Sequence, residues 1–179
     1  MALGMSEEWL GDQHKGSLTS LHLNHYPEVP RSLLETGKRN RCATHLDLDT
    51  LTLFLQDSVG GLEVAHMSST PEQNSRRVGQ TAAFVPVSSN PGSILVSGGH
   101  MLARYTNGRW RGGAHRVSAP FGPADGMCAQ RFSITFHVYP DPDVPVEPLK
   151  RYVEEAGSRK YKPIKAGDFL LKKRQQIYK

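Results

Sequence analysis

Short runs in which apolar and polar residues alternate, separated by glycine and proline breaks, fill most of this 179-residue chain. The clearest runs are Leu51 to Gln56 and Leu62 to His66, with Gly60-Gly61 between them. Alternation with a period of two is typical of a strand with one buried face, and paired glycines favour a tight return. Many short strands joined by turns predict a mainly β chain folded as a sandwich or barrel.

The other strand-like runs show the same alternation between turn-forming or polar boundaries. They are Ser17 to Tyr26, Arg41 to His45, Ala82 to Val87, Ser93 to Ser97, His115 to Ala119 and Arg131 to Tyr139. We expect polar loops over Glu28 to Asn40 and Met67 to Gln80, and one helical turn around Met101 to Tyr105. Towards the C-terminus the period becomes helical, which predicts short helices over Val146 to Ala156 and Lys165 to Tyr178.

Length and composition favour one domain over residues 1–179, with a β core at about 17–140 and helices within 146–179. Hydrophobic residues make up 37% and charged residues 22% of the chain, a globular rather than a disordered composition. The formal net charge is +5, and much of the basic excess lies near the C-terminus, as in Lys172-Lys173-Arg174. Because no aromatic residues are interleaved there, we interpret it as a solvated helix face and expect no nucleic-acid partner.

Cysteine usage and the absence of targeting signals favour a cytoplasmic protein. The chain has two cysteines, Cys42 and Cys128, which do not make a disulfide framework and fit a reducing compartment. The segment Met1 to Trp9 has neither a basic start nor an apolar run long enough for a signal peptide. No apolar stretch has the length of a membrane span, so we expect no membrane partner.

A candidate metal site begins with His45 and Asp47, which lie two residues apart in Thr44-His45-Leu46-Asp47. In an extended strand residues i and i+2 point to the same face, so the imidazole and the carboxylate would leave side by side. His115 is the best candidate for a third ligand, and two histidines with one carboxylate form the facial triad of non-haem Fe(II) oxygenases. The motif is weak by itself, and its alternative interpretation is a turn with a surface ion pair.

A candidate anion site lies on other strands. Arg131 and Ser133 share one face of the last strand, and a guanidinium beside a hydroxyl suits a carboxylate. Asn24 and Tyr26 share a face of the first strand and could bind the same anion. The alternatives are a structural ion pair for Arg131 and a core role for the Tyr26 ring, with its hydroxyl bonded to the backbone.

From about Leu21 to the C-terminus the chain resembles the 2-oxoglutarate and Fe(II)-dependent dioxygenase superfamily, in the plant and fungal branch that includes isopenicillin N synthase. The resemblance rests on several segments that occur in the family's order. They are Leu23-Asn24-His25-Tyr26-Pro27, His45-Leu46-Asp47, Leu51-Thr52-Leu53-Phe54-Leu55-Gln56-Asp57, Gly60-Gly61-Leu62-Glu63-Val64, Thr106-Asn107-Gly108-Arg109, His115-Arg116-Val117-Ser118, Arg131-Phe132-Ser133, Tyr161-Lys162-Pro163-Ile164 and Gly167-Asp168-Phe169-Leu170.

The resemblance implies a double-stranded β-helix, or jelly roll, with short C-terminal helices and an iron centre. Fe(II) would be held by His45, Asp47 and His115, and the family pattern selects Asp47 over its rival Asp49. The implied reaction is the hydroxylation or desaturation of a small organic substrate with O2, releasing succinate and CO2. The protein would keep coordination positions open in a shielded cavity and aim the substrate.

The resemblance also implies a site for 2-oxoglutarate as co-substrate. Its keto acid would chelate the iron, and its far carboxylate would meet Arg131 and Ser133. Tyr26 and Asn24 would contact the portion nearer the iron.

The chain departs from the family most clearly at its start, because it lacks most of the N-terminal region that family members usually carry. We expect this to leave sheet edges and apolar surface uncovered, and a homo-oligomer is one way to cover them. Two smaller departures are His100, where the family usually has aspartate after glycine, and the longer insertion Ser68 to Gln80. Two alternatives therefore stay open: a truncated, non-catalytic jelly-roll binding protein, and an isopenicillin N synthase-like oxidase that does not use 2-oxoglutarate.

Overall fold

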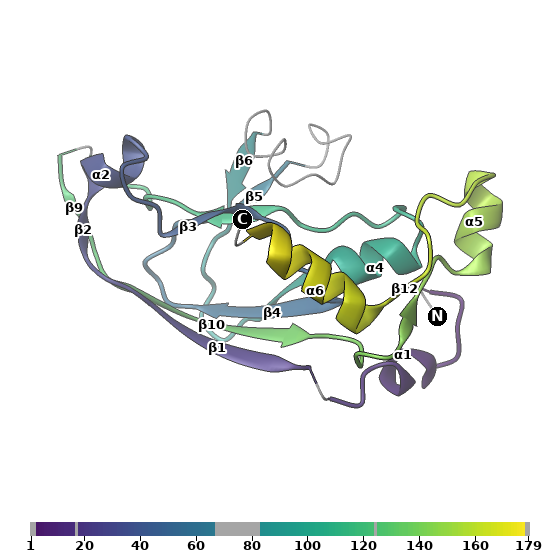
Figure 1. Ribbon diagram of the computed structural model, residues 1–179. Coiled ribbons are helices and arrows are strands. Elements are labelled where there is room, and N and C mark those ends of the chain that lie inside the picture. The colour runs from purple at the N-terminus through teal and green to yellow at the C-terminus, as the bar shows by residue number, and fades with distance from the viewer. Residues whose placement is uncertain (1–2, 17, 67–82, 124, 178–179) are drawn as a thin grey trace.

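The regular structure of the chain is mostly antiparallel β, arranged as two four-stranded sheets that lie over each other (Figure 1). The computed structural model describes residues 3–16, 18–66, 83–123 and 125–177. The loop expected over Met67 to Gln80, with the insertion Ser68 to Gln80, lies outside these residues. Two facing sheets confirm the β-rich fold class that the alternating pattern predicted.

The first sheet, which we call the major sheet, has the strand order β1-β10-β4-β7. Its strands are β1 (Ser20–Tyr26), β10 (Arg131–Val138), β4 (Leu51–Gln56) and β7 (Leu95–Gly98). Asn24 is the cross-strand partner of Ser133, and Thr52 is the partner of His137. Directly opposed residues share a face of a sheet, so the polar face of β1 continues across β10.

The second sheet, the minor sheet, has the order β3-β8-β5-β6. Its strands are β3 (Cys42–His45), β8 (His115–Val117), β5 (Leu62–Ala65) and β6 (Phe84–Pro86). His45 and His115 are direct cross-strand partners, next to a register shift in β3. This pairing places two imidazoles side by side on one sheet.

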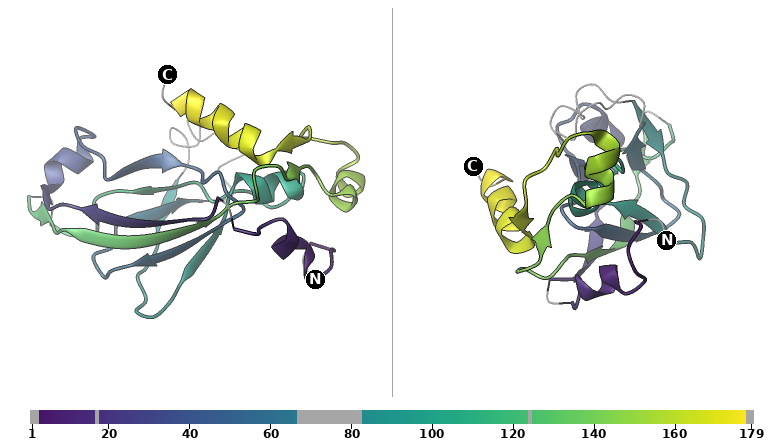
Figure 2. Two further views of the ribbon diagram at one scale, coloured as in Figure 1. Left: turned by 60° about the horizontal axis from the view of Figure 1, so that its bottom comes forward. Right: turned by 90° about the vertical axis from the view of Figure 1, so that its right-hand side faces the viewer.

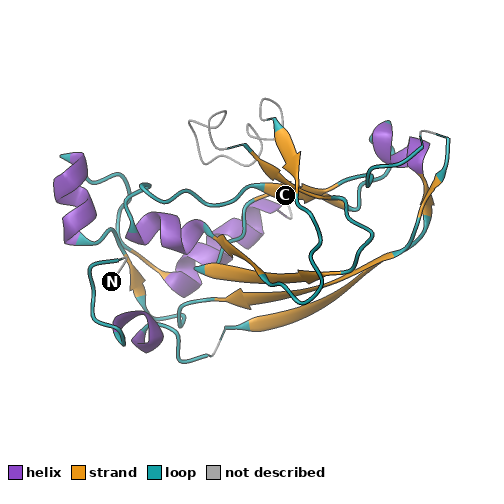
Figure 3. Ribbon diagram, turned by 180° about the vertical axis from the view of Figure 1, so that it is seen from behind, coloured by secondary structure: helices purple, strands orange, loops and turns teal. Residues whose placement is uncertain are grey.

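Two small sheets and five helices complete the described structure. Their bounds are β2 (Val29–Pro30) with β9 (Met127–Cys128), β11 (Pro145–Val146) with β12 (Ile164–Lys165), α1 (Trp9–Asp12), α2 (Arg31–Glu35), α4 (His100–Tyr105), α5 (Lys150–Ala156) and α6 (Ala166–Ile177). The helices α1, α4 and α5 gather at one end of the sheets, and α2 lies at the other (Figures 1 and 3). None of the described helices has the length and apolar character needed to span a membrane.

Three local predictions differ from the structure, the first two for a physical reason. α5 begins at Lys150 rather than Val146, because Val146 pairs with Ile164 in a short ladder. The stretch expected to be a polar loop contains the helix α2, whose Arg31 is buried and donates to the carbonyl of Pro120 at 2.6 Å. The first strand begins at Ser20 rather than Ser17.

The C-terminal elements pack onto the sheets through an apolar cluster. Met101 and Tyr105 of α4 meet Val146 of β11 and Ala166 and Phe169 of α6. The backbone amides of α4 also donate hydrogen bonds to the loop that leads into β4. The apolar contact and these hydrogen bonds together hold α4 against the start of β4. The C-terminal segment therefore supports the site end of the major sheet.

The outer face of the major sheet, in which β1 and β10 run side by side (Figure 2, left), carries exposed apolar side chains. Leu23 is 75% exposed and Phe132 50% exposed. We call this surface the outer apolar face and define it by Leu21, Leu23, Leu55, Phe132, Ile134 and Phe136. A hollow of about 560 Å³ lies on it. This sheet therefore presents a continuous apolar surface on its outer side.

Candidate metal centre

The three predicted ligands come together at the end of the minor sheet. β3 ends at His45 and β8 begins at His115, and Asp47 follows in the loop that leads to β4. The Nε2 atom of His45 lies 3.5 Å from Asp47 Oδ1, and Nε2 of His115 lies 3.8 Å from Asp47 Oδ2. The pair His45 and Asp47 is side by side as expected, but Asp47 lies beyond the strand instead of within it.

Hydrogen bonds fix the same orientation for both imidazoles. Nδ1 of His45 bonds the carbonyl of Ala43 at 2.8 Å, and Nδ1 of His115 bonds the carbonyl of Gly113 at 2.9 Å. A carbonyl only accepts, so each Nδ1 carries a proton, and Nε2 is the nitrogen that each ring would offer to a metal ion once that atom has no proton. Both free nitrogens therefore face Asp47.

Charge in this cluster is balanced within the cluster itself. Burial opposes a charge on His45, but the contact with the Asp47 carboxylate raises the pKa of His45 to about 10. Burial likewise opposes ionisation of Asp47, yet His45 and His115 lower the pKa of Asp47 to about 2. Burial lowers the pKa of His115 below its usual value. A proton on His45 balances the carboxylate here, and a bound divalent cation would take the place of that proton.

The donor set fits a first-row divalent metal. One ligand atom from each of His45, Asp47 and His115 lies within 4.8 Å of the other two. Two neutral imidazole nitrogens and one carboxylate oxygen on one side of an ion are the donors of the facial triad. A second group, Asp47, Asp49 and His137, meets the same spacing, so Asp49 remains a neighbour of the site.

A cavity of about 160 Å³ between the two sheets reaches these side chains. All seven predicted site residues line it, together with residues that the sequence reasoning did not assign to the site. These additional lining residues are His22, Cys42, Phe54, Leu62, Val117, Thr135 and His137. Two of these residues are histidines on strands of the major sheet, His22 on β1 and His137 on β10. Their strand alternation was the missed signal, because His22 shares the face of Asn24, and His137 that of Ser133.

Arg131 is the most buried cation near the cavity, with 2% of its surface exposed. Its Nε donates to the carbonyl of Gly60 at 3.0 Å, Nη1 to Ser133 Oγ at 3.1 Å and Nη2 to Gln56 Oε1 at 2.9 Å. The guanidinium lies 5.0 Å from the centre of the Tyr26 ring. These bonds use three of its five N–H groups, so capacity remains for a carboxylate.

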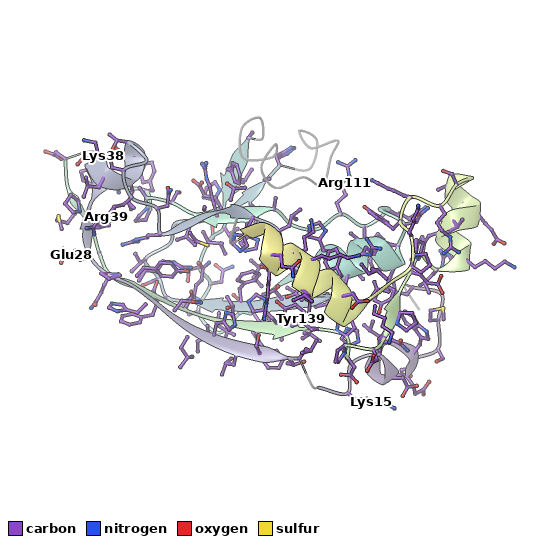
Figure 4. All side chains as sticks on the ribbon, in the orientation of Figure 1. Lys15, Glu28, Lys38, Arg39, Arg111 and Tyr139 are labelled. Atoms are coloured by element: carbon purple, nitrogen blue, oxygen red, sulfur yellow. The ribbon has the colours of Figure 1, made fainter. Side chains whose placement is uncertain are left out.

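The remaining predicted contact is Asn24, and Tyr139 lies near the carboxylates of the site. Asn24 lines the cavity from β1 and donates to Thr135 Oγ1 at 3.5 Å, a weak bond that leaves its amide free to turn. Tyr139 lies beside α6 (Figure 4), where burial, with Asp49 and Asp47 nearby, raises its pKa to about 12. Arg174 of α6 acts in the opposite direction on the pKa of Tyr139, so this helix lies near the residue that follows β10.

The fold and this donor set define a class of non-haem iron oxygenases. Residues 19–140 match the family model described as the 2OG-Fe(II) oxygenase superfamily. The chain belongs to this superfamily, whose fold is the double-stranded β-helix that the sequence predicted. The two facing sheets described above are that fold.

Particular relatives are fungal proteins of greater length. The proline hydroxylase buaE of Petromyces alliaceus is 39% identical over 145 residues, which are 80% of this chain and 42% of the relative. The 2-oxoglutarate-dependent dioxygenase gloF of Glarea lozoyensis is 34% identical over 163 residues, 89% of this chain and 45% of the relative. The chain therefore spans less than half the length of these curated relatives.

Solved structures show the same fold. A full-length Neurospora crassa protein, solved in complex with alpha-KG, superposes with a TM-score of 0.83 and 24% sequence identity. The match covers 98% of this chain and 50% of that one. At this identity the likeness establishes the fold alone.

Proposed function

We propose that this chain carries the catalytic core of an Fe(II)- and 2-oxoglutarate-dependent oxygenase. The observation that carries the proposal is the convergence of His45, Asp47 and His115, with both Nε2 atoms facing one carboxylate, beside a buried Arg131. The names of the similar fungal proteins support the same reaction class. In the proposed reaction a small organic substrate is hydroxylated or desaturated with O2, and succinate and CO2 are released.

The residues of the chain hold and orient the reactants in this proposal. Fe(II) on the three ligands supplies the chemistry that activates O2. The backbone carbonyls behind His45 and His115 fix the ring orientation, as second-shell partners of metal-bound histidines do.

The co-substrate would lie between the metal centre and Arg131. The spare N–H groups of Arg131 and the hydroxyl of Ser133 suit the far carboxylate of 2-oxoglutarate. Tyr26 and Asn24 line the same cavity from β1 and could contact the portion nearer the metal. A guanidinium that the protein already holds rigidly loses little entropy when it binds a carboxylate.

Turnover of 2-oxoglutarate tests the main proposal. The protein is loaded anaerobically with Fe(II) and 2-oxoglutarate, O2 is added, and succinate is measured by mass spectrometry. We expect succinate even without the organic substrate, from slow uncoupled turnover, and none from Asp47→Ala. A protein that binds Fe(II) and the keto acid but forms no succinate contradicts the proposal.

The oxidase alternative is separated by binding of the keto acid itself. 2-Oxoglutarate is titrated calorimetrically into the Mn(II) form of the wild type and of Arg131→Ala. The proposal expects binding that Arg131→Ala weakens by about 1.5–3 kcal/mol, the contribution of a hydrogen bond to a charged group. An oxidase that needs no 2-oxoglutarate would show no binding in either protein.

The non-catalytic alternative is supported by the exposed apolar surface of the major sheet. It predicts a folded protein that binds neither metal nor keto acid. Circular dichroism together with a metal titration therefore distinguishes it from the main proposal.

We also propose a homo-oligomer, in which a second copy covers the outer apolar face. Leu21 and Phe136 are paired across β1 and β10, as are Leu23 and Ile134, so the face is continuous. None of its six defining residues is charged, so two copies related by a twofold axis meet without repulsion.

We further propose a cytoplasmic location without nucleic-acid or membrane partners, which the free thiols of Cys42 and Cys128 support.

A further inference from the structure

A threonine hydroxyl lies between two buried carboxylates directly behind the candidate metal centre. Oγ1 of Thr52 lies 2.5 Å from Asp47 Oδ2 and 2.7 Å from Asp49 Oδ2. Thr52 and Asp49 have no exposed surface, and Asp47 is 7% exposed. On the far side, Nδ1 of His137 lies 2.8 Å from the same Asp49 oxygen. The side chains of Asp47, Thr52, Asp49 and His137 therefore form one continuous series of contacts, the contact chain, which ends at the proposed metal ligand Asp47.

The fold holds this chain of contacts in place from two directions. Thr52 and His137 are direct cross-strand partners on β4 and β10. The loop before β4 is fixed by backbone bonds from α4: the amide of His100 donates to the carbonyl of Asp47 at 2.8 Å, and that of Met101 to the carbonyl of Asp49 at 2.9 Å. Both the loop and the strand are therefore rigidly placed relative to Asp47.

The three contacts share two donor protons, one on the Thr52 hydroxyl and one on Nδ1 of His137. A threonine hydroxyl donates a single proton, and an ionised carboxylate only accepts. Thr52 can give its proton to Asp47, while the Nδ1–H group of His137 serves Asp49. With Oδ2 of Asp47 bonded to Thr52, its Oδ1 is the oxygen left facing Nε2 of His45.

The same residues could instead hold a second metal ion, because Asp47, Asp49 and His137 meet the spacing for one. Contacts of Asp49 argue against this. Its Oδ2 already contacts both Thr52 and His137. Its Oδ1 is buried without a partner in the described structure and lies against Gly99 rather than in the cavity.

We propose that Thr52, oriented by Asp49 and His137, is a positioning residue that fixes the carboxylate of Asp47 for metal binding. This inference rests on the proposed function, because it assigns Asp47 to the metal. Partners of this kind orient metal ligands, and losing one typically weakens metal affinity by about 10–100-fold. The expected effect is therefore on affinity and geometry at the ion.

Cobalt(II) is the probe, because its visible absorption reports coordination geometry. Affinity is measured by competition with a chelator for the wild type, Thr52→Val, Thr52→Ser and Thr50→Val. Thr50 is a matched control: it is fully buried, and its hydroxyl contacts Nε2 of His14 at 2.7 Å, away from Asp47. We expect Thr52→Val to weaken binding by about 10–100-fold and change the spectrum, while Thr52→Ser and Thr50→Val match the wild type.

A double-mutant cycle tests the part of Asp49. If Asp49 acts through Thr52, the double variant Asp49→Asn/Thr52→Val should lose no more cobalt affinity than Thr52→Val alone. If Thr52→Val does not fold by circular dichroism, Asp49→Asn decides: a weaker cobalt complex with an altered spectrum supports the inference, and a wild-type complex overturns it.

Three outcomes contradict the inference. Wild-type affinity and spectrum in a folded Thr52→Val refute it and leave the proposed function standing. A wild type that binds two cobalt ions, one of them lost in His137→Ala, shows a second metal site in place of a positioning network. A folded wild type that binds no cobalt refutes this inference together with the proposed function.

Discussion

At the scale of single residues, the site depends on which nitrogen each histidine presents. His45 and His115 each give Nδ1 to a carbonyl two residues earlier in the chain, so both present Nε2. The sequence placed an imidazole and a carboxylate close together and offered His115 as the third ligand, with Asp47 selected over Asp49 by the family resemblance. It could not show the orientation of the rings, because the carbonyl acceptors depend on the bend of the backbone at the strand ends.

Replacing His115 by glutamine tests its assignment as a ligand. Glutamine keeps much of the side-chain volume but lacks the imidazole nitrogen, so we expect cobalt affinity to fall by more than about 100-fold, beyond the loss of a second-shell partner. The control is His25→Gln, an exposed histidine that stacks on Phe132. Calorimetric titration of both variants checks this, and an unchanged affinity in His115→Gln would remove it from the ligand set.

The contact between His14 and Thr50 leads us to expect that the free energy of unfolding depends on pH. Burial lowers the pKa of His14, and both ring nitrogens are bonded, Nδ1 to the carbonyl of Leu10 and Nε2 to Thr50. Below about pH 6.5 the unfolded chain therefore binds a proton that the folded chain does not. The free energy of unfolding should fall as pH drops through this range, by at most about 1.4 kcal/mol per pH unit from this group.

The measurement is urea unfolding of the wild type and His14→Gln at neutral pH and in mild acid. Other groups titrate in both proteins, so the difference between them isolates His14. We expect the wild type to lose more stability on acidification than the variant. Equal losses in the two proteins would contradict the assignment.

At the scale of elements, alternation predicted strand existence well and strand neighbours poorly. Leu51 to Gln56 was predicted within its observed bounds, because Leu51, Leu53 and Leu55 recur with a period of two. The pairing of His45 with His115 and the ladder between Val146 and Ile164 join residues far apart in sequence, and no local pattern encodes them. The helix α2 was missed because its burial depends on Arg31 reaching a distant carbonyl.

The junction between the ligand loop and α4 is packed too tightly for a side chain at Gly99. A Cβ there would overlap the side chain and the backbone of Asp49. We expect Gly99→Ala to destabilise the fold by about 1–3 kcal/mol, the usual effect of overpacking. Gly11→Ala is the control, since nothing lies within 4 Å of a Cβ at Gly11. Thermal unfolding measures both, and equal melting temperatures would argue against this packing.

At the scale of the whole molecule, the alternation that points polar residues of β1 into the cavity also points leucines outward. Leu21 and Leu23 are 59% and 75% exposed, well beyond the half-buried strand that the pattern suggested. Sequence alternation shows which face is apolar, but what covers that face depends on other parts of a fold or on another chain. Contiguous apolar surface of this kind marks an interaction site or an aggregation hazard.

A lysine on the outer apolar face should disrupt the proposed homo-oligomer. Phe132 is 50% exposed on that face, whereas Phe121 is fully exposed elsewhere. Because a buried unpaired charge is costly, we expect Phe132→Lys to be monomeric at concentrations where the wild type and Phe121→Lys associate. Sedimentation velocity measures this. A monomeric wild type, or association that survives Phe132→Lys, contradicts the proposed interface.

The most direct test of the central claim is a crystal structure of the protein with Mn(II) and 2-oxoglutarate. The account predicts one ion bound by Nε2 of His45, Nε2 of His115 and the carboxylate of Asp47, with the far carboxylate of the keto acid on Arg131. An ion bound instead by Asp49 and His137, or a keto acid that makes no contact with Arg131, would contradict it.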